Sequence, residues 1–266
     1  MLRLAWAGLA LACSAAQALA GSPPPAEDPG NAPMRFEWRR EGPADVCGSS
    51  CRVWISAIGY LTSDTAREFE AFAEKRDVRG AVLVLDSDGG SVLGTIALGR
   101  AIRRLEMVTT VGKTTPLPPA AEGDRRAKLT PNASCESMCA FLLLAGSRRY
   151  VPPQAHVLVH QIWLGKKRKN ALDSSYSAEE LNLVQRDIGR LAQYTVEMGG
   201  GIDLLETALR IPPWEPLYAL SKEEIERMRL NTTATLFDQE PPTTSSISPA
   251  AAAALATVGH PAPRRD

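Results

Sequence analysis

The chain has 266 residues, of which 44% are hydrophobic and 23% charged, and this composition is that of an ordinary globular protein. Thirty basic and thirty acidic side chains cancel, which argues against a general affinity for nucleic acid or anionic membranes. One basic run, Lys166–Lys169, departs from this balance. We expect it to be a solvated surface loop, with contact to an anionic partner or a lipid head group as the alternative.

The first twenty residues have the features of a secretory signal peptide. Arg3 supplies a positive charge, Leu4–Ala12 is an apolar run, and Ala18–Ala20 offers the small residues that a signal peptidase recognises. We therefore expect residues 1–20 to be removed and the protein to be periplasmic or secreted, with no membrane span left. A retained membrane anchor is the alternative, but the apolar run is shorter than the ~20 residues that a spanning helix needs. Lipidation at Cys13 is a weaker option.

Two low-complexity regions flank a single expected domain. Residues 21–45 contain six prolines and few large apolar residues, which predicts a linker. Residues 238–266 are rich in Ala and Pro and are expected to be a disordered tail. Residues 46–237 lie between these regions and are enough for one folded domain.

Strand and helix patterns alternate along the expected domain. Short apolar runs predict strands at Arg52–Ile58, Ala81–Leu85, Val108–Val111 and Ala155–His160. Helical periodicity or a helix-length apolar run predicts helices at Thr62–Lys75, Val92–Leu105, Ser137–Ala145 and Ala178–Met198. This alternation predicts an α/β domain built on right-handed crossovers.

Four cysteines remain in the expected mature chain: Cys47, Cys51, Cys135 and Cys139. Two pairs in an exported protein predict disulfides, and four cysteines allow three connectivities. A zinc site is the alternative, but the C-x3-C spacing of both pairs is a poor match to structural zinc sites. We therefore expect disulfides and no metal.

Two turns carry groups that suit acyl-transfer chemistry. Gly89 and Gly90 follow an apolar strand, and paired glycines leave backbone N–H groups bare, which suits the binding of an oxyanion. A strand-to-helix turn also needs glycine for purely structural reasons. Ser137 opens an apolar helix, where it is either an ordinary N-cap or a nucleophile beside the helix's free N–H groups.

His160 is the candidate base. His156 and His160 stand four residues apart on one expected strand, so both side chains should lie on the same face. A metal pair is disfavoured because no third ligand is near them in the sequence. A buried structural histidine or a solvent-exposed one is the alternative for either residue.

The order of these features, with paired glycines, then the serine, then the histidine, resembles the proteolytic subunit of Clp protease. That family has Ser-Met at a helix start, a glycine after the helix, a strand beginning near Arg-Tyr, and a strand ending in His-Gln. The matching segments are Leu85–Gly90, Ser137–Leu143, Ala145–Gly146, Arg149–Pro152 and Val157–Gln161. The resemblance covers about residues 52 to 230, and it is closer still to exported relatives that carry Cys-x-Ser-x-Cys where Cys135, Ser137 and Cys139 stand here.

The resemblance implies a fold, a site and a protruding helix. The fold would be a spiral of β-β-α units, from which the helix at Ala178–Met198 projects as an arm for contacts between copies of the chain. Ser137 would be the nucleophile and His160 the base, with the N–H groups of Gly90 and Met138 as the oxyanion hole.

The third member of the triad does not match the family's pattern. The family's aspartate falls near Pro213 in this sequence, and Asp203 and Glu215 are the nearby carboxylates. We take Asp203 as the expected acid. Two further departures are an apparent inserted loop at residues 113–130 and Gln161-Ile162 in place of the family's Gln-Pro.

Together these features predict an exported serine hydrolase, a peptidase acting on peptides or proteins. We expect a homo-oligomer that needs no cofactor and has no nucleic-acid partner. A catalytically inactive oligomeric scaffold of the cell envelope is the alternative, because the acid is not matched. An acyl-CoA enzyme of the related crotonase type is disfavoured, since acyl-CoA is cytoplasmic.

Overall fold

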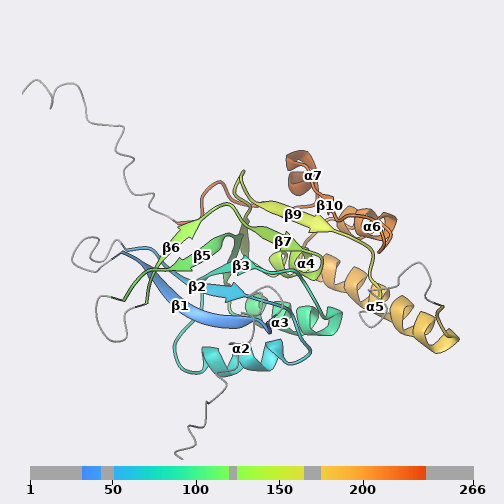
Figure 1. The fold of residues 1–266 in the computed structure, drawn as a ribbon, viewed down its shortest axis with the longest axis horizontal. Coiled ribbons are helices and arrows are strands. Elements are labelled where there is room, and N and C mark those ends of the chain that lie inside the picture. The colour runs from blue at the N-terminus through green and yellow to red at the C-terminus, as the bar shows by residue number, and fades with distance from the viewer. Residues whose placement is uncertain (1–31, 43–50, 120–124, 165–174, 238–266) are drawn as a thin grey trace, which may run out of the picture.

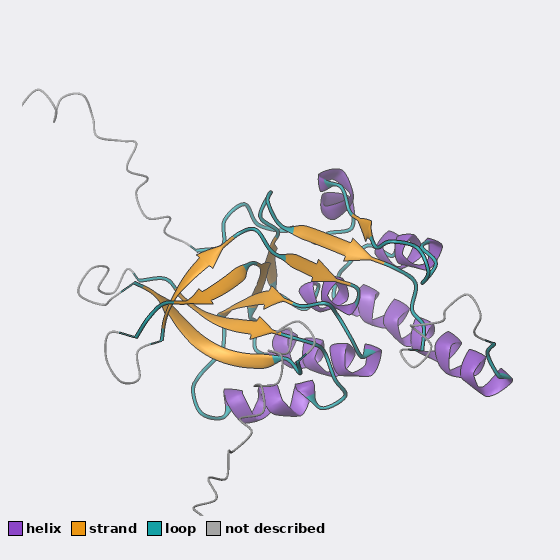
Figure 2. Ribbon diagram, viewed as in Figure 1, coloured by secondary structure: helices purple, strands orange, loops and turns teal. Residues whose placement is uncertain are grey.

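The computed structural model describes residues 32–42, 51–119, 125–164 and 175–237, and these form a mixed α/β fold (Figure 1). Helices pack against a mostly parallel sheet, so the expected α/β class is confirmed (Figure 2). The strands are β1 (Arg35–Glu41), β2 (Val53–Ile58), β3 (Val82–Asp86), β4 (Val108–Val111), β5 (Lys113–Pro116), β6 (Arg126–Thr130), β7 (Ser134–Glu136), β8 (Arg148–Tyr150), β9 (His156–Val159) and β10 (Tyr218–Ala219). The helices are α2 (Thr65–Ala73), α3 (Val92–Arg104), α4 (Met138–Leu143), α5 (Ala178–Glu197), α6 (Asp203–Arg210) and α7 (Lys222–Arg227).

Several sequence predictions fall outside the described residues. These are the signal peptide, the C-terminal tail, the run Lys166–Lys169 and Cys47. Within the described ranges, no helix has both the length and the apolar character that crossing a bilayer requires.

The larger sheet has seven strands in the order β5-β6-β1-β2-β3-β4-β8. Strands β2, β3, β4 and β8 run parallel, and α2 and α3 connect the first three of them. Leu83 and Leu85 of β3 belong to the main core, whereas Val82 and Val84 belong to a smaller apolar cluster that Leu236 and other residues cover. Burial of alternate residues in two separate clusters explains why this strand is a continuous apolar run.

Strand β1 lies where the sequence predicted a linker, so that prediction is wrong for residues 35–41. The strand is antiparallel to β2. Phe36 and Trp38 are two residues apart, so their side chains lie on the same face of the strand. The Phe36 ring lies 5.1 Å from the Phe69 ring of α2, and the Trp38 ring lies 6.4 Å from that of Phe72. Packing of these aromatic rings against α2 therefore stabilises β1, although the prolines nearby predicted a linker.

The expected inserted loop at residues 113–130 contains an antiparallel pair, β5 and β6, with residues 120–124 outside the described part. Strand β6 also pairs in parallel with β1. The insertion therefore extends the larger sheet at its edge.

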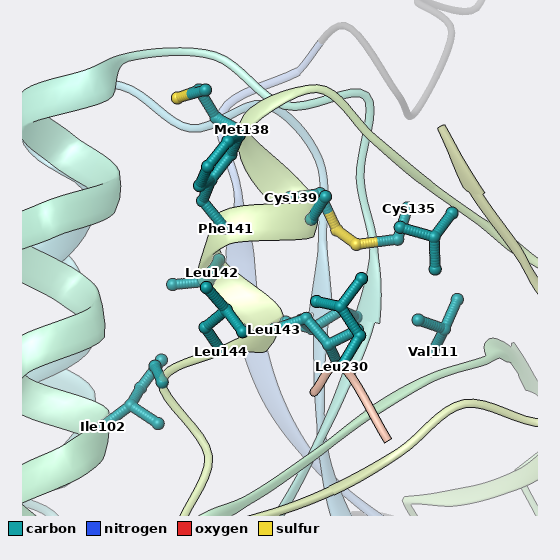
Figure 3. Close-up of a cluster of buried hydrophobic side chains, with 14 of the residues drawn as sticks. Ile102, Val111, Cys135, Met138, Cys139, Phe141, Leu142, Leu143, Leu144 and Leu230 are labelled. Atoms are coloured by element: carbon teal, nitrogen blue, oxygen red, sulfur yellow. A yellow bond between two sulfur atoms is a disulfide. The ribbon is translucent and has the colours of Figure 1, made fainter. Parts of the chain in front are cut away.

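A smaller sheet, in the order β10-β9-β7, leads directly into α4. All six residues of α4 are buried, and their side chains fill the core around Leu230 and Ile102 (Figure 3). Because β7 and α4 adjoin each other, Ser137 sits at the junction between the smaller sheet and the most buried helix.

Helix α5 begins with a capping box between Ser177 and Glu180 and projects away from the sheets (Figure 1). No residue from Ala178 to Arg190 is buried, whereas Leu191 and Tyr194 are fully buried. The C-terminal half of α5 therefore packs on the domain, and its N-terminal half is exposed and projects outward.

Two arginines hold the C-terminal ends of α4 and α5 together. Arg103 and Arg149 both donate hydrogen bonds to the carbonyls of Leu144, Gly146 and Met198, at distances from 2.8 to 3.3 Å. Carbonyls at helix C-termini carry partial negative charge, which compensates the cations. Burial, followed by repulsion from Arg103, lowers the pKa of Arg149 to about 10. The serine helix is therefore anchored at its C-terminal end.

Gly99 of α3 allows α3 and α5 to approach closely. A Cβ at this position would lie 2.0 Å from the hydroxyl of Tyr194, whose side chain is fully buried. We expect Gly99→Ala to destabilise the protein by about 1–3 kcal/mol through overpacking. The matched change Gly189→Ala, on exposed α5, meets no atom within 4 Å and should stabilise by up to about 1 kcal/mol. Urea unfolding measures both, and equal effects would contradict this account.

Candidate active site

Two turns lie against each other at the carboxyl end of β3. The N–H of Glu136 donates to the carbonyl of Ser87 at 2.9 Å, which joins the turn after β3 to the turn after β7. The hydroxyl of Ser87 donates to the carbonyl of Gly59 at 2.6 Å and accepts from the N–H of Gly89 at 3.2 Å. Ser87 is buried, so it fixes the glycine turn from beneath.

Gly89 is required by this contact. Its φ is +91°, and a Cβ would lie 2.7 Å from the Glu136 carbonyl oxygen and 2.8 Å from both the Met138 nitrogen and the Ser137 Cβ. Only a residue without a side chain lets the two turns approach so closely.

The N–H of Gly90 takes no part in the bridge that this residue forms on the other side of the turn. Gly90 forms an isolated bridge with Leu61, and the two hydrogen bonds of this bridge use the Gly89 carbonyl and the Ser91 N–H, each at 2.7 Å. In such a parallel bridge the N–H of the middle residue points away from the partner strand. The N–H groups of Gly90 and Met138 therefore both belong to the region where the two turns meet, as an oxyanion hole requires.

Ser137 occupies a strained position between β7 and α4. Its φ is +54° and its ψ is −119°, a conformation that few residues other than glycine adopt. Such strain costs about 1–3 kcal/mol and is concentrated at functional sites. The serine side chain makes no capping hydrogen bond, so the simple N-cap interpretation is wrong. A serine on a strained strand-to-helix turn is instead the arrangement of a nucleophile elbow.

Cys135 and Cys139 form a disulfide across this turn, and both are fully buried among the core side chains around α4 (Figure 3). This pairing decides the connectivity at the site and leaves neither thiolate for zinc. Cys51 is also disulfide-bonded, and Cys47 lies outside the described residues. A cross-link that closes so short a loop contributes about 2 kcal/mol in the chain-entropy model, comparable to the strain at Ser137.

His160 directly follows β9. The N–H of Ser137 donates to the Leu158 carbonyl at 2.8 Å, so β9 carries His160 alongside the serine turn. The His160 ring packs edge-on against Trp163, with ring centroids 6.0 Å apart. His156 is exposed at the other end of β9, opposite Ser134, and lies outside the cleft described next.

Ser137 and His160 line the same cleft, which has a volume of about 660 Å³. Gly90 and Met138 line it too, so the structure brings four of the five sequence-predicted catalytic groups to one cleft. Its other walls combine polar and apolar side chains. The apolar side chains are Leu61, Val92, Leu93, Ile162, Trp163, Leu164, Val184 and Leu217.

Asp203, the expected acid, lies elsewhere. It begins α6 and is paired with Arg227, whose Nε lies 2.9 Å from its carboxylate, and it does not line the cleft. Glu215 does not line the cleft either. Among the described residues, the carboxylates that do are Asp88, Glu136 and Asp187, and Asp187 also accepts a hydrogen bond from Arg190 at 3.2 Å.

The neighbouring strand places a leucine opposite His160. Ala219 pairs with Leu158 and Tyr218 pairs with Val159, so the next position in this antiparallel register sets Leu217 against His160. A leucine side chain accepts no hydrogen bond from an imidazole, so Leu217 cannot be the third member of a triad. This alignment is invisible in the sequence, because it follows from the register of β9 and β10.

A second, smaller cavity of about 270 Å³ lies between the larger sheet and residues 234–237. Thr110, Tyr150 and Arg52 are among its lining residues, and no cysteine, histidine or carboxylate is. Of these two cavities, the larger one contains the serine and histidine that nucleophilic catalysis would use.

Comparison of the chain with models of known protein families and with curated proteins finds no match. The geometry of the cleft and the sequence motifs therefore carry the functional argument.

Replacement of Gly89 should disturb the site, whereas a similar replacement elsewhere should not. We expect Gly89→Ala to cost at least about 2 kcal/mol of stability, because it adds a clash with the serine turn to an unfavourable φ. Gly80→Ala is the matched control, since Gly80 has a φ of +68° but a Cβ there meets nothing within 4 Å. Strain alone should cost it about 1 kcal/mol. Denaturant unfolding measures the loss of stability in both variants. If Gly89→Ala loses no more stability than Gly80→Ala, the close contact between Gly89 and the serine turn is not important for stability.

The carboxyl group of Asp86, at the start of the glycine turn, should make stability depend on pH. Burial raises its pKa, Lys113 lowers it by less, and Asp88 raises it slightly. The folded state therefore binds this proton more tightly than the unfolded state, so the contribution to stability falls as the pH rises through the folded-state pKa. We expect Asp86→Asn to be more stable than the wild type at neutral pH, and this gain to vanish in acid below about pH 4. Thermal unfolding across pH tests this, and a gain that persists in acid would contradict it.

Proposed function

We propose that the protein is an exported serine hydrolase of the Clp proteolytic-subunit type, acting on peptides or proteins. The observation that carries the proposal is Ser137, held in a strained strand-to-helix turn, in one cleft with His160. The buried disulfide supports export, because disulfides persist in oxidising compartments.

Each group has a defined role in the proposed reaction. The Ser137 hydroxyl attacks the carbonyl carbon of the substrate, and His160 accepts its proton. The N–H groups of Gly90 and Met138 stabilise the oxyanion of the tetrahedral intermediate. His160 then returns the proton to the leaving amine, and water attacks the acyl-serine to release the second product.

The acid that orients His160 is not Asp203 in this proposal, because that carboxylate is paired with Arg227 outside the cleft. Among the described residues, the cleft carboxylates Asp88, Glu136 and Asp187 are the candidates. Loss of the orienting acid lowers turnover by ~10⁴ in a well-studied triad, so its identity governs the rate that this site reaches.

The apolar part of the cleft wall favours apolar substrate side chains. Leu61, Leu93 and Trp163 lie around the reacting groups, and a site of this volume buries a side chain together with part of the backbone. We therefore propose peptides with a large apolar residue next to the cleaved bond as the substrate class.

A fluorophosphonate probe tests the nucleophile. We expect the wild-type protein to be labelled at Ser137 and Ser137→Ala to lose labelling altogether. His160→Gln should slow labelling by about 100-fold or more, because it removes general-base assistance. Ser134→Ala is the control, since Ser134 lies three residues before the nucleophile and does not line the cleft. Absence of labelling of the oxidised wild-type protein across a range of pH would overturn the proposal.

An oligomeric scaffold remains a second candidate, supported by the arm of α5. Leu181 is 49% exposed and Leu183 is 42% exposed on the projecting half of this helix. Exposed apolar side chains on a projecting helix are suited to contact with a partner, which we propose to be a second copy of the chain.

Charged substitutions on the projecting half of α5 test this self-association. We expect the double change Leu181→Glu/Leu183→Glu to shift the protein to a smaller species in sedimentation, because it places charges in an apolar interface. Gln185→Glu, which adds charge on the same half of α5 without removing an apolar side chain, is the control. An unchanged sedimentation coefficient in the double variant would exclude the arm as the interface. Self-association that persists without any labelling of Ser137 would favour the scaffold over the hydrolase.

A further inference from the structure

The serine turn has cysteines where a nucleophile elbow usually has glycines. In the pattern G-x-S-x-G, small residues stand two positions before and after the nucleophile and let the strand and the helix approach closely. Here Cys135 and Cys139 occupy those two positions and are bonded to each other, with Cα atoms 5.1 Å apart. The chain therefore has a covalent cross-link at the two places where that turn depends on close approach.

We propose that the Cys135–Cys139 disulfide is a positioning device, which keeps Ser137 in its strained conformation and so aims its hydroxyl into the cleft. The inference rests on the proposed hydrolase function. Neither cysteine lines the cleft, so the disulfide acts through Ser137 and not by touching a substrate.

Non-covalent contacts hold this turn on both sides of Ser137. The N–H of Glu136 is bound to Ser87, and the N–H of Ser137 is bound to Leu158. Both hydrogen bonds fix the chain up to the nitrogen of Ser137. After this nitrogen, the Ser137 carbonyl accepts a hydrogen bond from the N–H of Ala140 at 3.1 Å, and Gly89 packs against the Met138 nitrogen. The disulfide adds the covalent tie that spans the strained φ and ψ of the serine.

Relaxation of the turn would move two catalytic groups together. The Met138 N–H follows the ψ of Ser137, and the serine hydroxyl follows the orientation of its Cα. Loss of the cross-link therefore misplaces the nucleophile and half of the oxyanion hole. The apolar walls, which come from Leu61, Leu93 and Trp163, stay in place. The expected consequence is a slower chemical step with little change in binding.

The test uses the double variant Cys135→Ala/Cys139→Ala, with Cys51→Ala as the matched control. Cys51→Ala removes a disulfide-bonded cysteine that lies outside the serine turn. The measured quantities are the maximal rate constant of fluorophosphonate labelling and the probe concentration that gives half of it. We expect the maximal rate to fall about 100-fold in the double variant, as for a misplacement of about 1 Å, and the half-saturating concentration to change less than about threefold. Cys51→Ala should keep both values.

Circular dichroism shows whether the double variant is folded, and Cys135→Val/Cys139→Ala is a second version that restores volume in the core. A crystal structure of the double variant gives a readout independent of activity, in which the φ of Ser137 should leave the positive region. An unchanged labelling rate, or a retained positive φ, overturns the inference. Failure of both versions to fold also counts against it, because the bond would then serve the whole domain. If the wild type is not labelled, the hydrolase proposal fails, and the φ of the variant still decides the positioning role.

Discussion

The contact between Gly89 and the serine turn is the constraint on which the cleft depends. A hydrogen, and no larger group, fits between this backbone and the atoms of Glu136, Ser137 and Met138. The approach is close enough to bring the glycine turn, Ser137 and the first N–H of α4 to one place. Ser87, buried beneath the turn, holds the glycine side of this contact. The strand, the helix and the cleft are thereby fixed relative to each other.

The strain at Ser137 is supported from both ends of α4. At the N-terminal end the disulfide spans the turn, and at the C-terminal end Arg103 and Arg149 bind the carbonyls of α4 and α5. Between these anchors every residue of the helix is buried. A catalytic group needs this kind of rigid support, because its geometry must be held against relaxation.

Predictions from the sequence were correct where the local pattern of residues agrees with their burial. The apolar run ending at Leu85, the capped helix α5 and the Cys-x-Ser-x-Cys segment all lie where they were expected. The misses have physical causes. Strand β1 is stabilised by aromatic contacts with α2, which are invisible in a proline-flanked segment. Asp203 was chosen by its position in the sequence, but its charge is compensated by Arg227.

The sequence by itself determined the α/β alternation, the glycine turn and the candidate nucleophile and base, because each depends on residue type and short-range spacing. Tertiary structure alone decided that Cys135 pairs with Cys139, that Ser137 is strained, and that the register of β9 and β10 sets the position of Leu217 opposite His160. These properties depend on the register and packing of segments far apart in the chain. Local propensity does not encode such distances, and so the identity of the acid could not be read from spacing.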